Sequence, residues 1–262
     1  MHVLPSLPDA SAPPDAPMQE HGTNRTVDAG DPAVPSFAMN AASRVATGVA
    51  GIAAVVLLFA GQFVGAIGSH TEPAFDSSTR EIVAFLGSLR SGPQTAGSVI
   101  VLVGLVAFLT FAAGLRDVLA PADQGLPALA VRTAQLCAVA LVVAVMVGGW
   151  ELSVLRAGDL DPQIARLIYD QGSLTFAKSW VLLGGFAAGA GIGVLTGRAV
   201  PAWLGWWALV DAVGFLVARA LWLTQFWLLP YLLLWLWIVT ISVLVLVRTS
   251  REKRSTSSRH NA

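Results

Sequence analysis

The chain has few of the residues from which catalytic and metal sites are commonly built. A single cysteine, Cys137, cannot form an intramolecular disulfide or a multi-cysteine metal site. The four histidines all lie outside the apolar runs and none has metal-ligand spacing; they are His2, His21, His70 and His260. The sequence contains no catalytic, cofactor or metal motif, so we expect a protein that is not an enzyme and that needs no cofactor or metal ion.

Charged side chains are also scarce. They make up 12% of the residues, against about 25% in soluble domains. Hydrophobic residues make up 55% of the chain, and the mean hydropathy is +0.67. The formal net charge is zero, which argues against a nucleic-acid partner. This composition predicts an integral membrane protein.

Six segments reach the roughly 20 apolar residues that cross about 30 Å of hydrocarbon. We therefore predict an all-α, polytopic membrane protein whose transmembrane domain covers residues 43–248. The expected spans are residues 44–67, 96–115, 131–150, 174–196, 200–221 and 226–247. Residues 1–42 are rich in proline and lack an apolar run, which predicts a disordered tail and not a signal peptide.

The placement of arginine and lysine predicts how the chain is oriented, because cytoplasmic flanks accumulate positive residues. With both termini in the cytoplasm, the cytoplasmic segments hold ten such residues and the opposite segments four. We expect a multi-pass protein of the plasma membrane with cytoplasmic termini. Its basic C-terminal tail, residues 249–262, would lie close to anionic lipid headgroups.

Two short helices are predicted in the long connections on the extracytoplasmic side. Ser78 and Glu81 have the spacing of a capping box before an apolar stripe. Asp161 can cap a second helix that has Pro162 at its first position. Such helices either pack in the membrane interface or cover the outer mouth of the bundle.

Glycines and tryptophans give two further patterns. Glycine occurs at every fourth position of the fourth span, at Gly185, Gly189, Gly193 and Gly197, and the spacing recurs in the first span at Gly61 and Gly65. Small residues at this spacing predict close helix packing, with a sliding helix or a partner surface as alternatives. Tryptophans near the predicted membrane faces are typical of interfacial belts; Trp180, Trp222 and Trp227 belong to the outer belt.

Three ionisable residues lie within the predicted spans, near their outer third. They are Lys178, Asp211 and Arg219. Lys178 lies within about 20° of Gly185 around the helix, so we expect it and Asp211 to face protein and to form an ion pair. Such a pair serves either helix register or the binding of a ligand or proton.

The remaining candidate residues lie close to these three. Arg219 can reach Glu151 or the lipid headgroups. Gln62 and Tyr231 fall in the same outer third of the membrane. The candidate ligand or ion-pair site is therefore an outer-facing polar pocket formed by Lys178, Asp211, Arg219, Glu151, Gln62 and Tyr231.

Three stretches of the chain resemble a group of uncharacterised multi-spanning membrane proteins from high-GC Gram-positive bacteria, a domain of unknown function. They are residues 80–85, residues 161–169 and the run Pro201, Ala202, Trp203, Leu204, Gly205 and Trp206. The resemblance implies a bacterial membrane protein. It brings no assigned reaction or catalytic residue with it.

These patterns predict a protein that acts without covalent chemistry. The leading hypothesis is an interaction or accessory protein that contacts membrane lipids and a protein partner or a second copy of itself. The alternative is a small transporter or sensor that binds an amphiphilic ligand or lipid in the outer-facing pocket. Bound ligand, or its absence, would separate the two.

Overall fold

The computed structural model describes residues 41–89, 91–119, 125–148, 161–197 and 200–260, all within one unit, residues 39–262. Within those ranges the chain is helical, with no strand. Its elements are α1 (Ala41–Gly65), α2 (Thr79–Ser88), α3 (Ser91–Leu119), α4 (Leu126–Gly148), α6 (Pro162–Gly197), α7 (Ala202–Ala220), the 3-10 turn η1 (Gln225–Trp227) and α8 (Leu228–His260). Of the predicted tail, residues 1–42, residues 1–40 lie outside the described residues, and the last two belong to the first turn of α1.

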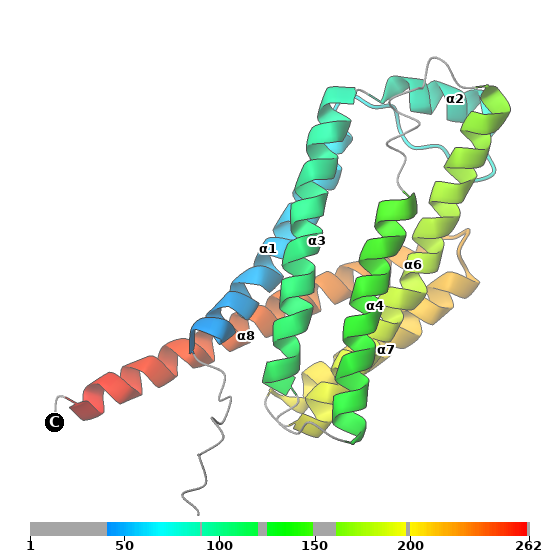
Figure 1. The fold of residues 1–262 in the computed structure, drawn as a ribbon. Helices are drawn as coiled ribbons and strands as arrows, with labels where there is room; N and C mark the ends of the chain where they lie inside the picture. Colours follow the sequence, from blue (N-terminus) through cyan, green and yellow to red (C-terminus); the bar gives the residue numbers. More distant parts are fainter. Residues whose placement is uncertain (1–40, 90, 120–124, 149–160, 198–199, 261–262) are drawn as a thin grey trace, which may run out of the picture. The chain divides into compact units, whose positions relative to one another are not determined.

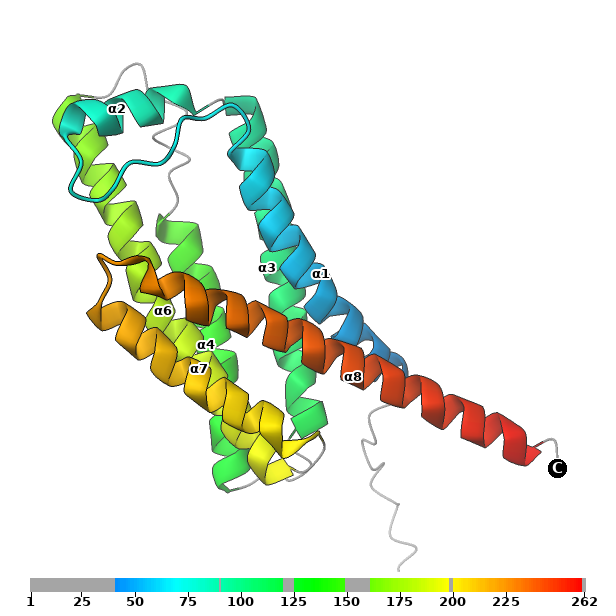
Figure 2. The same ribbon diagram turned by 180° about the vertical axis from the view of Figure 1, so that it is seen from behind.

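Six of these helices are long and apolar enough to cross a membrane: α1, α3, α4, α6, α7 and α8. The chain is therefore an integral membrane protein, and the predicted all-α polytopic fold is confirmed. Each of the six packs against the next one along the chain, and α8 packs against α1. The contacts thus close a ring of helices, in which α1 and α3 run side by side and α7 and α8 pack together (Figures 1 and 2).

The short helix α2 begins where the sequence predicts. The Ser78 hydroxyl accepts a hydrogen bond from the Glu81 amide at 3.3 Å, and the Glu81 carboxylate accepts one from the Ser78 amide at 2.9 Å. This reciprocal pair satisfies two amides that a helix start leaves open. The helix lies across one end of the bundle, called here the α2 end (Figure 1). Its apolar face packs on the first turns of α6 through Ile82, Phe85 and Leu86.

The second predicted short helix also starts as expected, since the Asp161 carboxylate accepts a hydrogen bond from the Gln163 amide at 2.8 Å. It does not end before the fourth span, however. It runs on into it as one 36-residue helix, α6. No proline follows Pro162 within this helix, and Gly172 alone does not stop a helix whose neighbours hold it in place. The first turns of α6 thus extend the span toward α2.

The glycine ridge of α6 packs inside the molecule. A Cβ atom at Gly185 would lie 2.6 Å from the Cys137 sulfur of α4, and one at Gly193 would lie 2.7 Å from a methyl group of Val131. Gly61 packs in the same way on Gly97 of α3. The prediction of tight helix packing is confirmed for these glycines, and none of them offers a free surface to a partner.

The last helix extends farther than the predicted span. α8 continues to His260, so most of the predicted C-terminal tail is helical. Arg44 at the start of α1 forms an ion pair with Glu252 of this extension, with 2.9 Å between nitrogen and oxygen. The pair is partly exposed, so its contribution to stability is small.

Candidate ligand-binding pocket

The segment between α1 and α2 is fixed to α6 by two side chains. The Arg166 guanidinium donates hydrogen bonds to the carbonyl oxygens of Ser77 at 2.6 Å and Phe75 at 3.0 Å. It also pairs with the Asp170 carboxylate at 2.9 Å. The Tyr169 hydroxyl donates a hydrogen bond to the Pro73 carbonyl oxygen at 2.6 Å. Residues 73–77 belong to no helix and contain one turn, in which the Ser77 amide donates to the Ala74 carbonyl oxygen at 3.0 Å. The contacts with α6 hold this segment as a wall of the pocket.

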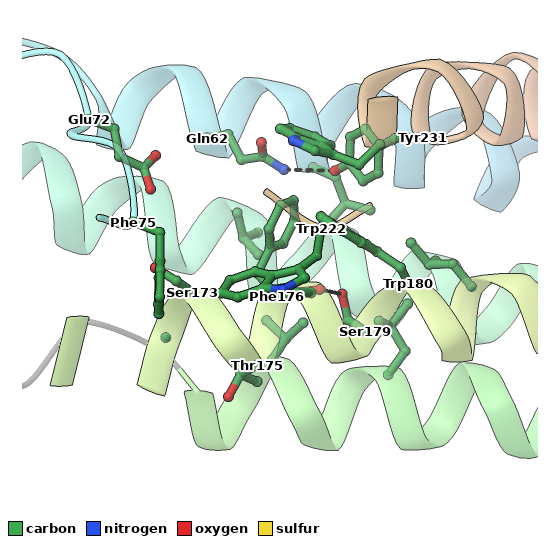
Figure 3. Close-up of a pocket in the computed structure, with 18 of the residues that line it drawn as sticks. Gln62, Glu72, Phe75, Ser173, Thr175, Phe176, Ser179, Trp180, Trp222 and Tyr231 are labelled. Atoms are coloured by element: carbon green, nitrogen blue, oxygen red, sulfur yellow. Dashed lines mark hydrogen bonds between the residues drawn. The ribbon is translucent and has the colours of Figure 1, made fainter. Parts of the chain in front are cut away.

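Beside this wall lies a cavity of about 780 Å³. It lies inside the ring, near the α2 end, and five of the six membrane-crossing helices contribute to it, all except α7. The volume lies within the range of pockets that hold small molecules. Figure 3 shows Glu72 and Phe75 of the connecting segment at one side of the cavity and Trp180 of α6 at the other.

Aromatic rings make up much of the lining. Phe176 and Trp180 of α6, Trp227 of η1 and Tyr231 of α8 form one connected cluster, with ring centroids between 5.1 and 6.4 Å apart. Phe75 packs edge-on against Trp222, with 4.6 Å between centroids. Such rings give a large apolar contact surface that loses little conformational entropy on binding, since each ring is already packed. The cavity is suited to an apolar or aromatic group.

The lining changes from polar to apolar with depth. On α6, Ser173 lies near the α2 end and Leu183 lies ten residues deeper, about 15 Å along the helix axis. On α1, Gln62 lies about one turn closer to the α2 end than Leu58 does. The deeper lining is mainly apolar and includes Leu58, Leu105, Phe108, Leu141, Leu183 and Trp235. Its polar groups are the Ser179 hydroxyl, which donates to the Phe176 carbonyl oxygen, and the indole N–H groups of Trp180 and Trp235. A molecule that fills this pocket needs a polar end and an apolar end.

Glu72 provides the charge at the polar end. Of the described residues that line the pocket, it is the only carboxylate, and none is Lys, Arg or His. The described part of the chain gives its side chain no hydrogen bond and no ion pair. Glu72 is exposed to solvent at the rim of the pocket. The protein around it still raises the pKa of this carboxyl above its ordinary value, because the charged form is less well solvated there than in free water. Among the described residues, therefore, no positive charge compensates this acidic group at one end of the pocket.

Two of the residues predicted from the sequence meet in this pocket. The Gln62 side-chain amide donates a hydrogen bond to the Tyr231 hydroxyl at 3.2 Å, as Figure 3 shows. Both residues line the cavity, on α1 and α8. Their hydrogen bond joins the first and last helices at the level of the aromatic cluster.

Lys178 and Asp211 do not form the predicted ion pair. Lys178 is exposed on α6, whereas Asp211 is 2% exposed and neither of its carboxylate oxygens has a hydrogen-bond partner among the described residues. Neither residue lines the pocket.

The cause is that α4 does not cover α6 along its whole length. Gly185 packs opposite Cys137, so Lys178, seven residues earlier, lies level with residues 143–147 of α4. In that stretch Val143, Met146 and Val147 are exposed, so this part of α4 does not bury Lys178. A glycine stripe predicts a buried face only as far as the neighbouring helix stays close.

The two other predicted residues are not brought into the site. Arg219 is partly exposed near the end of α7 and is not among the residues that line the pocket. Glu151 lies outside the described residues. The predicted polar cluster of six residues is therefore reduced to Gln62 and Tyr231.

Sequence reasoning missed most of the pocket because its lining has no unusual residue type. Trp180, Trp222 and Trp227 were expected in an interfacial belt, but all three line the cavity. A tryptophan near a membrane face has the same sequence signal in either place. The sequence did not indicate Glu72 as a pocket residue either, since it lies in a connection, where acidic residues are common.

No protein-family model, curated protein or solved structure significantly matches the chain. The resemblance to the bacterial multi-spanning proteins therefore stays a prediction.

Proposed function

We propose that this integral membrane protein binds an amphiphilic small molecule or lipid in the aromatic pocket, without covalent chemistry, as the recognition step of a small transporter or sensor. The observation that carries the proposal is the gradient in the pocket lining. Its polar end is formed by Glu72, Gln62 and Ser173, and its deeper part is apolar.

Two further observations support ligand binding over a purely accessory role. Arg166 holds residues 73–77, the wall of the pocket, through its hydrogen bonds to the carbonyl oxygens of Ser77 and Phe75, here called the arginine clamp. The cavity is therefore preorganised, and little ordering has to accompany binding. The glycine ridge, which an accessory protein could have offered to a partner, is occupied by α4 and by the end of α3.

Native mass spectrometry of the protein extracted in mild detergent tests this proposal. We expect a stoichiometric bound lipid or small molecule on the wild-type protein, and loss of that species from Phe176→Ala. Phe176 contacts three other rings of the cluster and lines the cavity.

Phe63→Ala is the matched control, because Phe63 is 77% exposed on α1 and does not line the pocket. Lys178→Ala is a second control, since Lys178 lies outside the pocket as well. A bare protein, or a species retained equally by Phe176→Ala and Phe63→Ala, would count against the proposal.

A further inference from the structure

The charge of the pocket determines which amphiphile fits it best. Within the part of the chain that the structure describes, its lining contains the carboxylate of Glu72 and no cationic side chain. Arg166, which holds the neighbouring wall, is already paired with Asp170. An anionic headgroup beside this rim carboxylate would therefore meet a like charge, a neutral one would gain no attraction from it, and a cationic one would be attracted.

The aromatic rings at the polar end also favour a cation, in addition to the carboxylate of Glu72. Phe75, three residues from Glu72, and Trp222 pack edge-on at 4.6 Å, and both line the pocket together with Glu72. The face of an aromatic ring attracts a cation that lies within about 6 Å of its centre, and indole is the strongest of the side-chain rings in this respect. A carboxylate beside aromatic rings is thus a chemical environment that favours an ammonium group.

We infer that the pocket selects amphiphiles with a cationic headgroup, an ammonium group that lies at Glu72 beside Phe75 and Trp222, with its apolar tail among Phe176, Trp180 and Tyr231. This inference rests on the proposed function and adds the charge of the ligand to it. The shared chemistry is an ammonium cation on an apolar tail. Its source is either a free cationic amphiphile or the headgroup of a choline-type lipid.

The raised pKa of Glu72 is in agreement with this assignment. Desolvation without a neighbouring cation makes ionisation of the carboxyl less favourable. An ammonium group in the pocket would reverse this effect by compensating the negative charge.

The test compares four octyl amphiphiles, each below its micelle concentration, on protein held in a neutral maltoside detergent. The headgroups are trimethylammonium (cationic), phosphocholine (zwitterionic, with the same ammonium), glucoside (neutral) and sulfate (anionic). Binding is followed by the intrinsic fluorescence of the tryptophans that line the pocket. Micelle effects are removed by subtracting the response of Phe176→Ala.

We expect octyltrimethylammonium to bind about tenfold more tightly than octyl glucoside, and octyl sulfate to bind most weakly. Glu72→Gln should abolish the preference for the cation and leave the affinity for octyl glucoside unchanged. The matched control is Asp76→Asn, because Asp76 is an acid of the same segment and is exposed as Glu72 is, but does not line the pocket. That variant should keep the full preference.

The affinity for octylphosphocholine shows whether the ammonium group belongs to a lipid headgroup or to a free cationic amphiphile. Octylphosphocholine bound as tightly as octyltrimethylammonium indicates a choline-type lipid headgroup, and much weaker binding indicates a free cationic amphiphile. Equal binding of the cationic, neutral and anionic compounds would overturn the inference but leave the proposed function standing. If no compound binds the wild type more strongly than it binds Phe176→Ala, both the inference and the proposed function are wrong.

Discussion

Trp180 of α6 and Trp227 of η1 stack with their ring centroids 5.8 Å apart and their planes inclined by 14°. One ring comes from the middle of the chain and the other from the turn before the last helix. The stack is part of the pocket wall, so it links the packing of α6 and α8 to the shape of the cavity.

Removing one ring of this stack should weaken ligand binding. We expect Trp227→Ala to lower the occupancy of the pocket by an octyl amphiphile at least tenfold, because it removes a large part of the aromatic surface. Trp203→Ala is a matched control, since Trp203 stacks on Trp207 at the same 5.8 Å but outside the pocket. Each variant loses one stacked pair, about 1 kcal/mol, and Trp227→Ala also loses edge contacts with Phe176 and Tyr231. Binding is therefore compared at the same interval below each variant's melting temperature, and equal effects on binding would show that the stack acts only through stability.

Binding of a cationic amphiphile should depend on pH through Glu72. The pKa of this carboxyl is raised, so the neutral acid persists to higher pH than for an ordinary glutamate. Only the ionised form attracts the cation, and affinity should therefore rise as pH increases through this pKa and fall on acidification. Titrations of octyltrimethylammonium at several pH values check this.

Other groups near Glu72 must be separated from it in that experiment. Tyr169 and the Arg166–Asp170 pair lie on α6, and His70 lies in the same connection. Glu72→Gln keeps all of these, so any pH dependence that it retains belongs to them. A profile identical to that of the wild type would contradict the prediction.

The clamp on residues 73–77 should depend on Arg166. Arg166→Ala removes two charge-assisted hydrogen bonds and an ion pair, and each hydrogen bond to a charged donor contributes about 2 kcal/mol. We expect faster hydrogen exchange in residues 70–78 and weaker ligand binding, with little change in the exchange of α3. Arg80→Ala, at an exposed position of α2, should leave the exchange of residues 70–78 unchanged. Unchanged exchange in Arg166→Ala would show that the segment is held in another way.

The contact between α1 and α3 should not tolerate a side chain at Gly97. A Cβ atom there would lie 2.5 Å from the Gly61 carbonyl oxygen and 2.6 Å from the Gly65 amide nitrogen. Both atoms belong to backbone, so the helices must separate, at a cost on the order of 2 kcal/mol. Gly92→Ala on the same helix meets nothing within 4 Å and should be neutral or slightly stabilising. Thermal melting in detergent compares the two, and equal melting temperatures would contradict this packing.

Replacing Asp211 should not harm the fold. Its carboxylate is buried without a hydrogen-bond partner among the residues described, so Asp211→Asn removes an ionisable group and breaks no interaction. We expect a melting temperature equal to or higher than that of the wild type, and no effect of Lys178→Met. A large loss of folded protein in Asp211→Asn would indicate that this carboxylate has an essential partner after all.

The sequence predicts the fold of this chain well because membrane helices obey one strong rule, that apolar length must match the bilayer. All six spans, the capping box at Ser78 and the N-cap at Asp161 follow from local patterns. The ends of helices were less predictable. α6 and α8 run past their spans because nothing in the sequence at those points interrupts a helix.

The site was predicted only in part because it depends on which helices lie next to each other. Gln62 and Tyr231 were singled out as polar residues at similar depth, and they do meet. Depth alone also paired Lys178 with Asp211, but the pairing failed because the two residues point to different surroundings, one exposed and one buried. The aromatic lining comes from α3, α6, η1, α8 and two connecting segments, and no single segment carries a pattern for it.

The packing of α8 against α1 has a consequence for how the protein is made. The hydrogen bond between Gln62 and Tyr231 joins residues 169 positions apart, so it forms only after nearly the whole chain has been synthesised and inserted. Loops of this length close late in folding because their entropy must be lost before the contact stabilises them. The pocket is therefore completed only when the last helix reaches the first, and an incompletely inserted chain lacks part of the cavity wall.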